Sequence, residues 1–109
     1  NDEDRKEWLI ALNKLAVDHK HKGAIIACSA LKKNYRSLLR AGMGNCMTFV
    51  YLDGSFELIK SRLEKRKGHF MPINLLQSQF DALEPPSKAI IVSIEETPVK
   101  IVKQIMKEL

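Results

Sequence analysis

The first apolar positions of the chain recur at helical spacing. They fall at i, i+4, i+7 and i+8, which predicts one buried stripe on an amphipathic helix. These positions are Trp8, Leu12, Leu15 and Ala16. Asn1 or Asp2 can cap this helix, its first turn is acidic as a helix N-terminus favours, and the helix should end near Gly23.

Three short runs of apolar residues predict strands. They are GAIIACSAL (23–31), CMTFVYL (46–52) and AIIVSI (89–94). Runs this short, and rich in small or β-branched residues, are typical of strands that are buried on both faces of a parallel sheet. With the helices that follow them, they predict three strands and about five helices in the chain.

Amphipathic helices are predicted after each of these strands. The turn at Gly42 stops one helix, Ser55 begins the next, Pro72 begins another, and Thr97 caps the last with Pro98 in its first turn. Their apolar faces carry Leu31, Tyr35, Leu38 and Leu39; Phe56, Ile59 and Leu63; Leu76, Phe80 and Leu83; and Val102, Ile105, Met106 and Leu109. Strands that alternate with helices predict an α/β fold with a parallel sheet and right-handed crossovers.

Length and composition narrow the class of protein. The 109 residues suffice for a single domain, 1–109, with an adequate core. Hydrophobic residues make up 45% and charged residues 28%, which is typical of a globular chain rather than a disordered one. No apolar run approaches the roughly 20 residues of a membrane span and no leader opens the chain, so a cytoplasmic location is expected.

The cysteines indicate no special chemistry. Cys28 lies inside one apolar run and Cys46 begins another. They lack C-x-x-C spacing and a partnering pair of histidines, so neither metal binding nor redox chemistry is indicated. Two buried, reduced thiols are expected.

The net charge of +5 favours anionic partners, and two basic clusters could bind them. In the first cluster, Lys32, Arg36 and Arg40 are spaced i, i+4 and i+8 on one predicted helix face with no acid between them. Like charges at that spacing repel, and a bound anion would offset the repulsion. A solvated face is the alternative for any single residue, but Ser29 at the predicted strand end favours binding by the cluster. Tyr35 is interpreted as core.

The second cluster contains Arg62 and Arg66, one turn apart on a predicted helix face. Two guanidinium groups that converge can grip phosphate oxygens. Gly68 permits a backbone turn after them. The positive charge around His69 disfavours its protonated form, which indicates a hydrogen-bonding group rather than a general base; an ordinary loop histidine is the alternative.

Several other function classes find little support. No catalytic triad, metal-ligand set or pair of acids in a cleft is evident, and the phosphate-cradling motif G-x-x-x-x-G-K-[ST] is absent from these residues. Composition alone would permit a small basic nucleic-acid binder. Few aromatic residues lie near the basic ones, however, and the glycine-aromatic signature of an RNA-recognition sheet is missing, so no nucleic-acid or membrane partner is expected.

Three longer segments are more specific than any single residue. NDEDRKEWL (1–9), CSALKKNYRSLLR (28–40) and RLEKRKGHFMPINLLQSQFDALEPP (62–86), in this order, resemble the gluconate kinase family. That family belongs to the nucleoside-monophosphate-kinase-like branch of the P-loop kinases. The resemblance implies a P-loop-kinase-like parallel sheet wrapped by helices. It also implies transfer of the ATP γ-phosphoryl group to D-gluconate, with Mg²⁺, to give 6-phosphogluconate.

The resemblance assigns roles to the basic residues. Segment 62–72 is similar to the mobile lid that closes over ATP, with Arg62 and Arg66 as candidates to contact ATP and neutralise the transferring phosphoryl group. The substrate side would face the carboxylate and hydroxyls of gluconate. Its candidates are Lys32, Arg36, Arg5 and His69. A homodimer of the whole protein is also implied, because the family forms dimers.

Two departures from the family pattern lead us to expect altered properties of this chain. Ser37 stands where an Asp usually follows the Tyr-Arg pair, which could weaken the orientation of Arg36. Family members also carry a central strand and a Walker-type glycine loop before the position that matches Asn1. We therefore expect the 109 residues alone to lack kinase activity and the middle strand of the sheet. The alternatives are an inactive truncated isoform that acts through dimerisation, and a kinase of a related small sugar acid.

Overall fold

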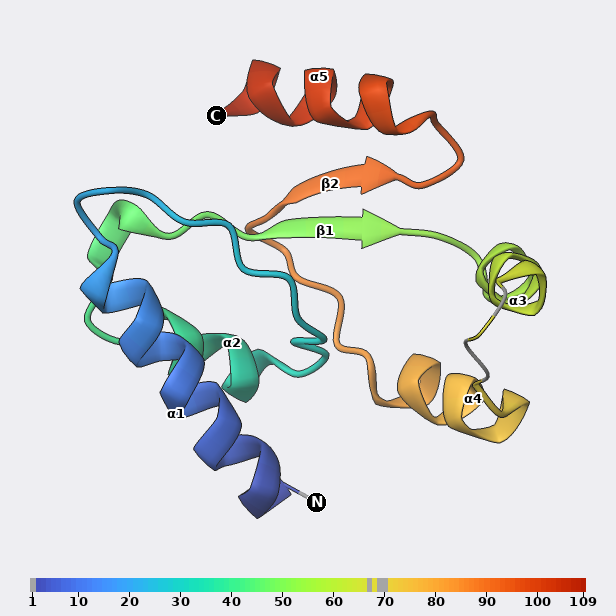
Figure 1. The fold of residues 1–109 in the computed structure, drawn as a ribbon, viewed down its shortest axis with the longest axis horizontal. Coiled ribbons are helices and arrows are strands. Elements are labelled where there is room, and N and C mark those ends of the chain that lie inside the picture. Colours follow the sequence, from blue (N-terminus) through green and yellow to red (C-terminus); the bar gives the residue numbers. More distant parts are fainter. Residues whose placement is uncertain (1, 67, 69–70) are drawn as a thin grey trace. The chain divides into compact units, whose positions relative to one another are not determined.

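The computed structural model describes residues 2–66, 68 and 71–109, apart from the Asp2 side chain. The chain forms two compact units, unit 1 at Asn1–Thr48 and unit 2 at Phe49–Leu109, and Figure 1 labels the elements of both. The prediction of one domain over 1–109 stays a prediction.

Unit 1 is built on a pair of helices. α1 covers Asp2–Asp18 and α2 covers Lys33–Arg40, and they pack against each other. A short 3-10 helix, η1, follows at Gly44–Cys46. The buried apolar residues of this unit are Leu9, Ala16, Tyr35, Leu39 and Met43. The predicted helices and the core position of Tyr35 are therefore confirmed, although α1 ends earlier than Gly23.

The buried face of α1 differs from the predicted stripe. Trp8 and Leu15 were expected inside but are 45% and 47% exposed. Asn13 lies on the face that meets α2, where its amide donates hydrogen bonds of 2.7 Å to the carbonyls of both Leu39 and Ala41. A polar residue in a packed face escapes a search for apolar periodicity. Here it satisfies carbonyl groups that the end of α2 leaves without helical partners.

Residues 23–31, which were predicted as a strand, form no strand in the structure. Ile25 has a relative exposure of 101%, and no described residue pairs with this segment as a neighbouring strand. A strand exists only where its backbone groups bond to a second strand, so apolar content alone cannot make one. The expectation of buried thiols is also wrong, because Cys28 and Cys46 are free and exposed.

Unit 2 holds a parallel sheet. Its two strands among the described residues are β1 (Val50–Asp53) and β2 (Ile90–Ser93), which pair with Val50 opposite Ile90. Ile90 and Val92 are buried on the face that these two positions share. The sheet and its helices confirm the predicted α/β class, with two described strands instead of three.

The agreement with the predicted strands is uneven. The run at 89–94 is confirmed as a strand, since β2 lies within it. The run at 46–52 becomes a strand only from Val50, because Cys46 still belongs to η1. The apolar pattern thus located these strands but not the start of β1.

Three helices complete unit 2 among the described residues: α3 at Phe56–Lys65, α4 at Ile73–Ala82 and α5 at Pro98–Glu108. α3 packs against α4, where the rings of Phe56 and Phe80 meet edge to face with centroids 5.5 Å apart and an interplanar angle of 78°. α5 packs against β2.

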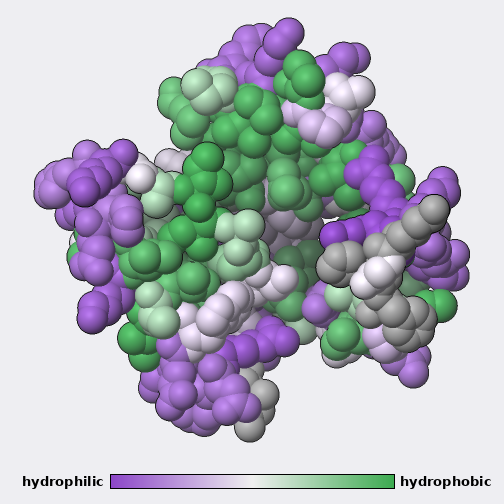
Figure 2. Space-filling view, viewed as in Figure 1, coloured by the Kyte–Doolittle hydropathy of each residue, from purple (hydrophilic) through white to green (hydrophobic). Residues whose placement is uncertain are grey.

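The predicted helix starts of unit 2 are confirmed by their caps. The Ser55 hydroxyl accepts a 3.1 Å hydrogen bond from the Leu58 amide, and the Thr97 hydroxyl accepts one of 3.3 Å from Lys100. Pro98 occupies the first turn of α5, where its missing N–H costs nothing. Apolar surface remains visible beside the charged surface in the space-filling view (Figure 2), in keeping with Met106, which is 65% exposed on α5.

Candidate functional site

Two of the predicted substrate-side cations, Arg5 and Lys32, lie near the ring of Tyr35 in unit 1. The Arg5 Cζ atom, from the first turns of α1, lies 5.7 Å from the ring centroid. The Lys32 Nζ atom, from the residue that precedes α2, lies at the same distance, 5.7 Å. Tyr35 is followed directly by Arg36 on α2. We call Arg5, Lys32, Tyr35 and Arg36 the Tyr35 cluster.

Backbone carbonyls orient Arg36. Its Nη1 atom donates hydrogen bonds of 2.8 Å to the Ala30 carbonyl and 3.2 Å to the Leu31 carbonyl. Ser37 donates a 3.1 Å hydrogen bond to the Lys33 carbonyl one turn earlier on its own helix. The expected effect of Ser37 on the orientation of Arg36 stays a prediction, while the Ala30 and Leu31 carbonyls hold the Arg36 guanidinium against the segment before α2.

The rest of the first basic cluster lies differently from the prediction. Lys32 has extended backbone angles as the N-cap residue, so it does not lie on the face of α2. Arg40 is the last residue of α2 and is exposed, as is Ser29. Lys32 reaches the cluster through the Tyr35 ring rather than through helical spacing with Arg36.

In unit 2 the two predicted lid arginines make different contacts. Arg62 lies within α3, and its Nη2 atom donates a 2.6 Å hydrogen bond to the Ile94 carbonyl just after β2. Arg66 is the C-cap residue of α3, with extended backbone angles and its own amide bonded to the Leu63 carbonyl. The backbone is therefore helical at Arg62 and extended at Arg66. The predicted role of His69 falls outside the described residues.

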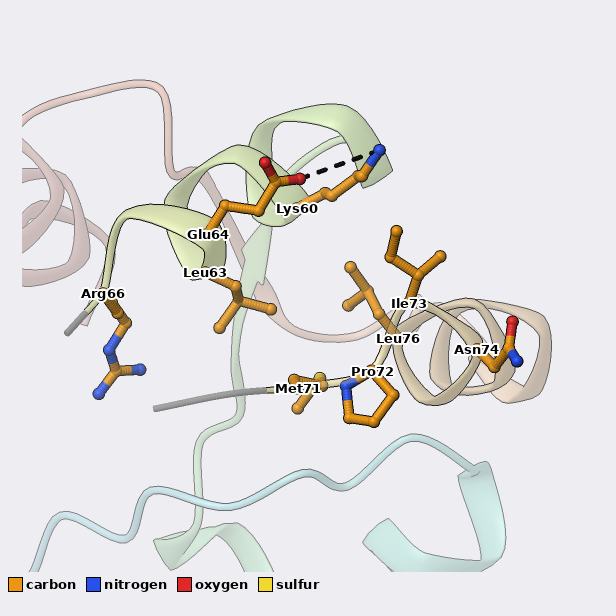
Figure 3. A pocket seen from close by; sticks show the side chains of 9 residues that line it. All are labelled: Lys60, Leu63, Glu64, Arg66, Met71, Pro72, Ile73, Asn74 and Leu76. Atoms are coloured by element: carbon orange, nitrogen blue, oxygen red, sulfur yellow. Dashed lines mark ion pairs between the residues drawn. The ribbon is translucent and has the colours of Figure 1, made fainter. Parts of the chain in front are cut away.

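A cavity of about 550 Å³ lies beside Arg66, between α3 and the start of α4 (Figure 3). Lys60 and Glu64 form a 3.9 Å ion pair at its α3 side. The residues that line it are Lys60, Leu63, Glu64, Arg66, Met71, Pro72, Ile73, Asn74 and Leu76. The cavity thus combines an apolar wall with Arg66, and part of its lining belongs to the predicted lid segment 62–72.

Ile94 forms backbone hydrogen bonds both to the end of β1 and to the Arg62 side chain. Its amide donates a 2.9 Å hydrogen bond to the Asp53 carbonyl at the end of β1. A β-carbon placed on Gly54 would lie only 2.6 Å from Ile94 Cγ1, so a side chain at position 54 would force the Ile94 side chain to shift. Sequence reasoning missed Ile94 because it contributes backbone groups, which residue type does not reveal.

Two titratable groups among the described residues have shifted pKa values. Partial burial, then the Asp53 carboxylate and its hydrogen bond with the phenol, raise the pKa of Tyr51 on β1. Partial burial also raises the pKa of the Cys28 thiol. A raised thiol pKa opposes thiolate formation, so Cys28 lacks the feature of an activated nucleophile.

The described residues offer no ligand set for a metal ion, because they contain no group of three or more His, Cys, Asp or Glu side chains placed to hold one. Within residues 2–66, 68 and 71–109, no helix is long and apolar enough to cross a membrane.

Relatives of known family supply the decisive comparison. The thermoresistant gluconokinase of Escherichia coli is 47% identical over 102 residues, which cover 88% of this chain and 58% of that protein. A probable gluconokinase of Mus musculus is 40% identical. The match covers all of this chain and 71% of the mouse protein. The chain belongs to the gluconokinase family. No family model matches it.

A solved structure supports the same membership for this gluconokinase-family chain. The crystal structure of a gluconokinase from Sinorhizobium meliloti 1021 is 34% identical and superposes with a TM-score of 0.87 over 98% of this chain and 62% of that one. The predicted P-loop-kinase-like α/β fold and the carbohydrate kinase family are thereby confirmed. The chain spans 58% and 46% of the two Escherichia coli gluconokinases that it matches.

Proposed function

We propose that the gluconokinase-family protein to which these residues belong transfers the γ-phosphoryl group of ATP to D-gluconate and releases 6-phospho-D-gluconate. The observation that carries the proposal is the Tyr35 cluster, in which Arg5 and Lys32 lie near the Tyr35 ring and carbonyls just before α2 hold Arg36. All three cations are half-buried. The names of the relatives support the same substrate.

The chemistry of the Tyr35 cluster suits a sugar acid. Arg5, Lys32 and Arg36 offer positive charge and N–H donors to a carboxylate and neighbouring hydroxyls. Arg36 enters binding already oriented, because its Nη1 atom is held by the Ala30 and Leu31 carbonyls. Fewer degrees of freedom are then lost when the substrate binds.

The lid side of the proposal concerns the phosphoryl group. Arg62 and Arg66 would neutralise charge that develops during transfer, and His69 would serve as a hydrogen-bonding group on the substrate side. Mg²⁺, when bound with ATP, supplies charge neutralisation at the phosphates. The exposed position of Arg66 after the last residue of α3 suits a side chain that moves with a lid.

The 109 residues by themselves are proposed to be inactive, since they contain no phosphate-cradling G-x-x-x-x-G-K-[ST] motif. The unpaired segment 23–31 is consistent with a sheet that needs a further strand. A homodimeric assembly and a cytoplasmic location belong to the same proposal.

A coupled assay for 6-phosphogluconate tests the function. The natural gene product that contains these residues should convert D-gluconate with ATP and Mg²⁺, and the 109-residue chain should not. Turnover of another sugar acid in place of gluconate would support the alternative of a related substrate. Absence of any turnover by the natural gene product, together with its assembly into dimers, would favour a catalytically dead isoform.

A further inference from the structure

Two substrate-side cations meet at a single aromatic ring. The Arg5 Cζ atom and the Lys32 Nζ atom each lie 5.7 Å from the centroid of the Tyr35 ring. Within about 6 Å the negative face of an aromatic ring attracts a cation, and more strongly where water is excluded. The ring therefore attracts both cations, although the two repel each other.

The burial of the cluster favours this arrangement. Tyr35 is only 4% exposed, and Arg5 and Lys32 are half-buried. Leu39, one turn later on α2, is buried as well and has no ring. An aliphatic side chain such as Leu39 also fills the core of unit 1 from α2. The aromatic ring at position 35 can therefore serve a second purpose besides packing.

We propose that Tyr35 is a positioning residue whose ring holds Arg5 and Lys32 together as a pair of cations for the carboxylate of a small sugar acid. The inference rests on the proposed function for the identity of the ligand, and it adds a role for a residue otherwise assigned to the core. Without the ring, one attraction that holds the two cations is lost, and a binding anion must order them further, which lowers affinity.

The test compares Tyr35→Leu with Tyr35→Phe in the natural gene product that contains these residues. Phenylalanine keeps the ring and loses only the hydroxyl, whereas leucine keeps an apolar side chain and loses the ring. A ring shifts the NMR resonances of protons above its face upfield. The Lys32 ε-methylene and Arg5 δ-methylene resonances should therefore be shifted in the wild type and Tyr35→Phe, and unshifted in Tyr35→Leu.

D-gluconate is then titrated into each protein, with the same resonances as the readout. We expect Tyr35→Leu to weaken binding about tenfold, and Tyr35→Phe to stay within about twofold of the wild type. Circular dichroism checks that each variant folds. If the leucine variant does not fold, Tyr35→Met provides the same comparison with a more adaptable side chain.

Each outcome decides between the two proposals. Unshifted wild-type resonances, or equal gluconate affinities for Tyr35→Leu and Tyr35→Phe, would overturn the role of Tyr35. Shifted resonances that respond to inorganic sulfate but not to D-gluconate would support the role of Tyr35 and overturn the proposed substrate. No response to either anion would overturn both.

Discussion

The two basic regions of this chain differ in how they hold their cations. In the Tyr35 cluster, Arg36 is fixed by two carbonyls, and Arg5 and Lys32 share a buried ring. In unit 2, the exposed Arg62 side chain donates to the Ile94 carbonyl, and Arg66 follows the end of α3 beside a cavity. Fixed cations suit a ground-state ligand, and loosely held ones suit charge that appears only during a reaction.

The largest expected effect tests the loosely held pair. Replacing both Arg62 and Arg66 by Ala in the natural gene product should lower kcat for gluconate phosphorylation about a thousandfold or more, because arginines that neutralise a transferring phosphoryl group act in the transition state. Steady-state kinetics measures this, with Lys65→Ala, an exposed neighbour on α3, as the control. An unaltered rate in the double variant would remove the lid assignment.

The next effect tests the fixed cations. Arg36→Ala should raise KM for gluconate about a hundredfold, because an oriented, charged donor is lost from a half-buried site. kcat should change much less. Lys33→Ala is the matched control, since Lys33 is an exposed cation at the start of the same helix. A change confined to kcat would contradict the distinction between the two regions.

A smaller effect concerns the frame that carries the Tyr35 cluster. Asn13→Ala should destabilise unit 1 by about 2 kcal/mol, because two carbonyls at the end of α2 lose their donor. Thermal unfolding followed by circular dichroism measures the change. Asn34→Ala, at an exposed position of α2, should leave the unfolding temperature nearly unchanged. Equal effects of both substitutions would show that the two hydrogen bonds contribute nothing specific.

The smallest effect is a titration in unit 2. Because the pKa of Tyr51 is raised, its neutral form favours the fold; this contribution is present below the ordinary pKa of about 10 and is lost as pH rises through the folded value. Asp53→Asn removes the neighbouring charge and should lower the pKa of Tyr51. Absorbance of the tyrosinate measures it, and Tyr51→Phe identifies the signal of the other tyrosine. An unchanged titration would leave burial as the whole cause.

Much of unit 2 could be predicted from the sequence because its signals are local. Ser55, Thr97 and Pro98 mark helix starts through their own side chains, and the structure confirms each of them. The apolar run at 89–94 was also sufficient for β2, since this strand finds β1 as a partner. Local chemistry thus located these elements without knowledge of their neighbours.

The failures concern residues whose state depends on a distant partner. The run at 23–31 has the composition of a strand, yet no described residue pairs with it. Asn13 belongs to a packed face because of carbonyls on α2, and Ile94 matters through its backbone. Tyr35 was correctly predicted as core, but its proximity to Arg5 and Lys32 depends on how α1 and α2 pack.

Gly54 limits how the sequence of this chain can diverge. Any larger residue there would push against the Ile94 side chain, and Ile94 is bonded through its backbone to both Asp53 and Arg62. A larger residue at position 54 would therefore disturb the start of α3 and the hydrogen bond between Ile94 and Arg62. A substitution at position 54 should therefore require either a different rotamer of Ile94 or a smaller residue at position 94.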